Sequence, residues 1–110
     1  MNTQNQPKIG QIFYTSWGYD QTNTEFMKIV EITATGKTAK CVMLKNVQVD
    51  AWNVKPGEAK GVVFRMKIDV FHDEAILRGT YPYCEGDTQF GSAYPLKEES
   101  AYQTAANYGH

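Results

Sequence analysis

Cysteine and histidine are scarce in this chain, which has two of each among its 110 residues. A secreted scaffold of this size normally carries several closely spaced disulfides, so Cys41 and Cys84 predict a reduced chain. Cys41 lies in the apolar run of residues 41–44 and is expected in the core, whereas Cys84 is expected in a more exposed loop. The isolated histidines, His72 and His110, do not match the clustered spacing of a zinc site. We therefore predict neither a metal nor another cofactor.

Long apolar runs and an excess of either charge are also missing. No segment approaches the roughly 18 to 20 consecutive apolar residues that span a bilayer. Residues 1–9 have neither the cationic start nor the apolar run of a signal peptide. We therefore expect a cytoplasmic protein with no membrane partner. The 11 Lys and Arg residues against 12 Asp and Glu give a net charge of −1, so the molecule as a whole has no cationic field for coating DNA.

Catalytic signatures are absent from the sequence too. It contains no nucleophile motif, no Gly-rich phosphate loop and no histidine beside a plausible nucleophile. Asp20 and Asp73 are candidates for a lone general base, but isolated carboxylates in loops usually serve as solvated or capping groups. We therefore predict that the protein is not an enzyme.

The apolar pattern that is present favours strands within a single domain, residues 1–110. Residues 64–70 have the clearest alternation, with Phe64, Met66, Ile68 and Val70 on one expected dry side. The other predicted strands cover residues 11–17, 25–33, 38–45 and 76–83. The fold is therefore expected to be mainly β, and because the second of these strands has apolar groups on both faces, we expect a curved sheet that folds over itself. The prediction is a small, partly open antiparallel barrel of about five strands, of the SH3-like or OB-like kind.

The connections are predicted from turn-forming residues. Residues 34–37 read as a hairpin, and residues 71–74 as a solvated turn. Residues 50–61 collect Pro and Gly and predict a long surface excursion. The strand meander is expected over residues 10–83, followed by an irregular, aromatic tail, residues 84–110, that packs back onto it. A short helical turn near residues 98–106 is the alternative for part of this tail.

The segment from Ser16 to Asn23 combines large aromatic groups with several hydrogen-bonding side chains. Trp17 and Tyr19 offer stacking faces, while Asp20, Gln21 and Asn23 can hydrogen-bond at fixed edges, a combination by which proteins read a base. The structural alternative is equally simple: Trp17 closes the core, and the polar side chains stabilise their own loop.

Charge is unevenly distributed along the chain. Basic side chains concentrate in residues 37–67 and acidic ones in residues 68–110. From the basic segment, Lys40, Arg65 and Lys67 are the candidates for neutralising a phosphate. The alternative is that the two segments simply meet inside one fold or across a dimer.

Residues 10–26, together with two short stretches near the end of the sequence, resemble a known group of proteins. The pattern Gly10-x-Ile12-Phe13-Tyr14-x-Ser16-Trp17-Gly18-Tyr19-Asp20-Gln21-Thr22-Asn23-x-x-Phe26, with the endings Tyr102-Gln103-Thr104 and Gly109-His110, resembles a group of small, functionally uncharacterised proteins encoded by bacteriophages, prophages and other mobile elements. The resemblance implies a setting, the cytoplasm of a bacterial host cell, and supplies no mechanism.

These observations lead to two hypotheses for the function. The first is a non-catalytic binding protein that acts in host takeover or anti-defence. It would sequester a nucleotide-like small molecule or block a host protein, with a homo-oligomer as one way to build sites between subunits. The alternative is a nucleic-acid-binding small β-barrel, which the basic segment favours and the overall charge opposes.

Overall fold

A computed structural model describes residues 6–17, 22–84, 87–98 and 100–102 of the chain. These residues contain strands and no helix. The strands are β1 (Ile12–Trp17), β2 (Asn23–Ile32), β3 (Thr38–Asp50), β4 (Asn53–Phe71), β5 (Glu74–Cys84), β6 (Asp87–Pro95) and β7 (Ala101–Tyr102). The predicted mainly-β small barrel is confirmed, although β1 to β6 form a six-stranded barrel where about five strands were expected.

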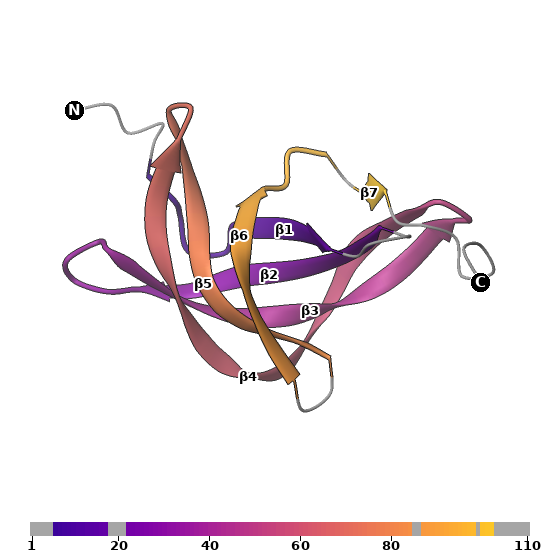
Figure 1. The fold of residues 1–110 in the computed structure, drawn as a ribbon, viewed down its shortest axis with the longest axis horizontal. Helices are drawn as coiled ribbons and strands as arrows, with labels where there is room; N and C mark the ends of the chain where they lie inside the picture. The colour runs from indigo at the N-terminus through magenta and orange to yellow at the C-terminus, as the bar shows by residue number, and fades with distance from the viewer. Residues whose placement is uncertain (1–5, 18–21, 85–86, 99, 103–110) are drawn as a thin grey trace.

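The barrel is an antiparallel meander, since each of its strands pairs with the next along the chain and β6 returns to β1 (Figure 1). Register shifts interrupt the pairing of β2 with β3, of β3 with β4 and of β5 with β6. Such bulges bend strands and increase their twist, which is how a short sheet curls far enough to close. The barrel therefore depends on local irregularities in long strands.

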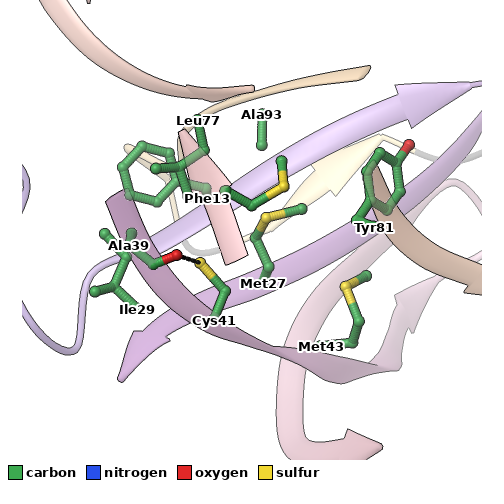
Figure 2. Packing of buried hydrophobic residues seen from close by; sticks show 10 residues of the cluster. Phe13, Met27, Ile29, Ala39, Cys41, Met43, Leu77, Tyr81 and Ala93 are labelled. Carbon is green, nitrogen blue, oxygen red and sulfur yellow. Dashed lines mark hydrogen bonds between the residues drawn. The ribbon is translucent and has the colours of Figure 1, made fainter. Parts of the chain in front are cut away.

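Side chains on one face of each strand fill the barrel (Figure 2). Phe13, Met27 and Met43 occupy matched positions on three neighbouring strands, and each is buried. Cys41 is buried as predicted, and burial raises the pKa of its thiol to about 12. The remaining buried members of this cluster are Ile29, Ala39, Met66, Leu77, Tyr81 and Ala93.

A second apolar cluster lies on the opposite face of β2 and β3. Its buried members are Phe26, Leu44 and Val54, with Leu96 and Ala101 packed against them. Val54 belongs to β4, and its pairing with Ala101 of β7 brings the end of the described chain over this cluster. This second layer explains why both faces of the β2 sequence are apolar.

The predicted excursion at residues 50–61 is wrong. β3 continues to Asp50 and β4 begins at Asn53, so a tight turn joins two long strands that project beyond the barrel (Figure 1). Gly57 is needed for close packing within this hairpin, because an added Cβ would lie 2.7 Å from the Val47 side chain and 3.1 Å from the Lys45 carbonyl oxygen. The Pro and Gly residues therefore sit inside a distorted strand pair.

The irregular tail predicted from residue 84 is also wrong for the part that the structure describes. Cys84 is the last residue of β5, residues 87–95 form β6, and Ala101–Tyr102 form β7 where a helical turn was the alternative. Gly91 weakens the strand signal of β6, yet it packs closely on a core ring, since an added Cβ would lie 3.3 Å from Tyr81. Pairing with β5 thus imposes a strand on a sequence of low strand propensity.

The turn predicted at residues 71–74 is confirmed. His72 and Asp73 connect β4 to β5, with φ of 50° and 64°. Two central residues with positive φ match the hairpin turn whose twist suits antiparallel strands. Val70, expected on the dry side of its strand, is 55% exposed, because β4 continues past the barrel core before this turn. In the part of the chain that is described, no helix has the length and apolar character needed to cross a membrane.

Candidate ligand-binding surface

The barrel closes between β1 and β6 through a short pairing. Among the described residues these strands pair only at Phe13 with Pro95 and at Tyr14 with Tyr94. Beyond this point β1 continues to Trp17, while β6 diverges from it (Figure 1). The divergence leaves a hollow of about 500 Å³, here called the seam cleft, lined by residues 14–17, 89–92, Tyr81 and Tyr94.

Aromatic side chains dominate the rim of the seam cleft. Phe90 is 69% exposed and Tyr94 is 38% exposed, so both present ring surface to solvent. Tyr14 faces Tyr94 across the junction, with ring centroids 6.3 Å apart. Exposed rings on a sheet give a planar ligand a stacking surface that costs little side-chain entropy.

Polar groups from two neighbouring strands lie deeper in the cleft. The side-chain amide of Gln89 donates a hydrogen bond to the Tyr81 hydroxyl oxygen at 2.5 Å. Both residues line the cleft, and Tyr81 is almost completely buried. Because a phenol donates as well as accepts and an amide carries an oxygen acceptor, this pair can read the polar edge of a bound group.

Trp17 is the last residue of β1 and is half-buried. Its indole Nε1–H donates to the Glu25 carboxylate at 3.3 Å, and its half-buried ring lines the seam cleft. Burial raises the pKa of Glu25 above its ordinary value of 4.5, while the Trp17 hydrogen bond and the charge of Lys60 lower it. Trp17 is a member of neither core cluster of the described residues; it is held by a hydrogen bond to Glu25, and its ring lines the seam cleft.

A second hollow of about 510 Å³ adjoins the outer surface of β4, β5 and β6. We call it the cationic hollow, because Arg65, Lys67 and Arg78 line it together with a single carboxylate, Asp69. Asp69 and Arg78 form an ion pair at 3.5 Å. The pKa of Asp69 lies below its ordinary value, mainly because the Val70 backbone N–H donates to it and also because cations lie nearby.

Like charges face each other across the strands at this surface. Lys67 is the direct partner of Arg78, and Lys40 is the direct partner of Arg65. Such pairs destabilise a sheet when nothing compensates them. Neither Arg65 nor Lys67 forms an ion pair with any residue that the structure describes. One member of each pair already has a carboxylate partner, Arg78 with Asp69 and Lys40 with Glu31. The charges left for a bound anion are those of Arg65 and Lys67.

Phe90 connects the two hollows. It lines the seam cleft with its aromatic neighbours, and it also lines the cationic hollow with Arg65 and Lys67. A stacking surface and a cationic surface therefore meet at one exposed ring.

The residues predicted from sequence are only partly brought together. Trp17 lines the seam cleft, and Arg65 and Lys67 line the cationic hollow. Asn23 pairs with Trp17 across β1 and β2 but lines neither hollow, and neither does Lys40, whose ammonium binds Glu31 at 3.4 Å.

Asn23 and Lys40 are far from each other. Glu31, which binds Lys40, lies about 26 Å from Asn23 along β2 at about 3.3 Å per residue. The predicted residues Tyr19, Asp20 and Gln21 lie outside the described part of the chain.

Several residues of this surface were not predicted, among them Phe90, Tyr94 and Arg78. The first two alternate with Ser92 along β6, so a period-two aromatic signal exists in the sequence. The Gly and Pro residues of that segment conceal it. To predict Arg78 as part of this surface, the register of β4 with β5 must be known, and no local sequence pattern supplies it.

In the part of the chain that the structure describes, no group of three or more His, Cys, Asp or Glu side chains could hold a metal ion. Comparisons with protein-family models, curated proteins and solved structures gave no match. The function is therefore inferred from the geometry of this surface.

Proposed function

We propose that this protein is a non-catalytic binding protein that holds a nucleotide-like ligand. The base stacks against Phe90 in the seam cleft, and the phosphate binds Arg65 and Lys67 in the cationic hollow. The observation that carries this proposal is the position of Phe90, which lines both hollows.

The physical chemistry of the two hollows matches the two halves of a nucleotide. Stacking of a base on an aromatic side chain is worth about 1–3 kcal/mol. A guanidinium such as that of Arg65 binds phosphate through charge-assisted and often paired hydrogen bonds. The polar pair of Gln89 and Tyr81 supplies groups that can discriminate one base edge from another.

Binding without turnover suits the ionisable groups that line this surface. Asp69 is the one carboxylate among the described residues of the two hollows, and its lowered pKa makes it a weak base. A protein that only holds its ligand acts stoichiometrically. Such action fits host takeover or anti-defence by sequestration, and the resemblance to phage and mobile-element proteins implies a bacterial host cell as the setting.

The proposal is tested with a panel of nucleosides and nucleoside monophosphates. Trp52→Phe leaves Trp17 as the sole tryptophan, and its fluorescence then reports on the seam cleft. We expect at least one monophosphate to change this fluorescence and its parent nucleoside to bind more weakly, because it lacks the phosphate. Absence of binding across the panel, checked by calorimetry, would refute the proposal.

The phosphate contact is tested with a matched pair of lysine variants. Lys67→Gln should weaken monophosphate binding and leave the folding stability unchanged or slightly higher, since it removes one member of a repelling pair. Lys55→Gln is the control, because Lys55 is exposed on the projecting part of β4 and pairs with Val47. Equal effects of the two substitutions on binding would contradict the assignment of the cationic hollow.

A further inference from the structure

On the outer surface of the barrel, exposed aromatic side chains continue from Phe90 along β6 to Tyr94 and Phe71. The inference below rests on the proposed function. We infer that the site accepts a single-stranded oligonucleotide. One base stacks at Phe90, a later base stacks on Tyr94 and Phe71, and the backbone between them crosses Arg78 and Lys67.

A second aromatic platform supports this inference. Tyr94 and Phe71 have ring centroids 6.3 Å apart and are 38% and 51% exposed. They come from β6 and from the end of β4, and Ile76 of the intervening strand is buried. Phe90 and this pair thus offer two separate stacking surfaces on the outer face of the sheet.

Cations lie between the two platforms. Ser92 is midway between Phe90 and Tyr94 on β6 and is the direct partner of Arg78, which is in turn the direct partner of Lys67. A row of one hydroxyl and two cations thus crosses the sheet at the position where the backbone joining two stacked bases would pass. Phosphate contacts of this kind hold a strand in register without reading its sequence.

The spacing of the platforms suits a short strand. Phe90 and Tyr94 are about 13 Å apart along β6 at about 3.3 Å per residue. This distance spans about four steps at the duplex rise of about 3.4 Å per nucleotide, which takes about five nucleotides, and it takes fewer in a more extended strand. A mononucleotide reaches only one platform.

The ligand should be single-stranded, because bases stack on side chains only when they are free of a duplex partner. The net charge of −1 excludes a general attraction to nucleic acid. Attraction should therefore come from the local row of cations, and its salt dependence should be correspondingly small.

The experiment measures the affinity of the full chain for oligodeoxythymidylates from one to about eight nucleotides, by fluorescence anisotropy with calorimetry as a check. Affinity should rise up to about four nucleotides and then level off. With Arg65, Lys67 and Arg78 engaged, the slope of log K against log salt should be about −2. A duplex of the same sequence should bind much more weakly.

Two variants identify the second platform and the cations. Phe71→Ala should lower affinity for the tetranucleotide about fivefold to a hundredfold and leave mononucleotide affinity unchanged. Val70→Ala is its control, because Val70 is equally exposed and its side chain points to the opposite face. Arg78→Gln should reduce the salt slope by about 0.7, whereas Lys55→Gln should not change it.

The outcomes separate this inference from the proposed function. Mononucleotide binding with no gain from added length would overturn the inference and leave the proposed function intact. Equal binding of duplex and single strand, or an unchanged tetranucleotide affinity in Phe71→Ala, would also overturn it. If neither mononucleotides nor oligonucleotides bind, both proposals fail.

Discussion

Replacing Phe90 by alanine distinguishes a binding role from a structural one. The ring is 69% exposed, so about a third of its surface is covered by the protein. A fully buried aromatic side chain covers about 150–250 Å², and a third of that is about 65 Å². At about 25 cal/mol per Å², Phe90→Ala should cost at most about 1.6 kcal/mol of folding stability.

The same substitution should have a clear effect on binding. Loss of a stacking partner costs about 1–3 kcal/mol, which lowers affinity by about fivefold to a hundredfold. Stability is measured by urea denaturation, and affinity by calorimetric titration with the nucleoside monophosphate that binds the wild type most tightly. Val49→Ala is the control, since Val49 is 52% exposed on the projecting part of β3.

A core position gives the opposite pattern. Phe13 is fully buried, so Phe13→Ala should cost about 3–5 kcal/mol of stability. Any protein of this variant that remains folded should bind nucleotide normally. The reasoning is refuted if Phe90→Ala destabilises the fold as strongly as Phe13→Ala does, or if its nucleotide affinity equals that of Val49→Ala.

Three further predictions concern the interior of the barrel. Burial raises the pKa of Glu25 above 4.5, so wild-type stability should fall as pH rises from about 4.5 through the folded-state pKa. Glu25→Gln should remove that fall. Urea denaturation of both proteins at each pH tests this, and the same loss of stability with rising pH in Glu25→Gln as in the wild type would contradict it. Burial raises the pKa of Cys41 to about 12, and Cys84→Ser leaves it as the only thiol to be labelled. In the native Cys84→Ser protein, Cys41 should resist alkylation by iodoacetamide at neutral pH, and it should react once the protein is unfolded. Rapid labelling of the native protein would count against this. Gly91→Val should cost about 1–3 kcal/mol in urea denaturation, because its side chain would crowd the Tyr81 ring; a neutral effect would show that this contact is not tight.

The sequence was informative where hydrophobic alternation and turn chemistry act together. β1, β2 and β5 follow from their apolar patterns, and the turn at residues 72–73 follows from its polar composition. The burial of Cys41 follows from its apolar neighbours. In each case the local signal and the tertiary environment favour the same structure.

The sequence misled where tertiary pairing overrides local propensity. β6 and the projecting part of β4 contain Gly and Pro, and their strand structure depends on neighbours that are remote in sequence. Because Phe90 and Tyr94 lie on β6, missing this strand also meant that they were not predicted as site residues. Lys40 was proposed because it belongs to the basic segment, residues 37–67, but pairing with β2 places it beside Glu31, with which it forms an ion pair.

The most direct test of the account is to map the bound ligand onto the molecule by NMR. Backbone amide shifts are recorded while the protein is saturated with the tightest-binding nucleoside monophosphate. The account predicts that the largest changes fall on residues 14–17, 65–67 and 89–94, around the two hollows that Phe90 joins. Changes concentrated in the projecting hairpin, residues 45–58, would contradict it.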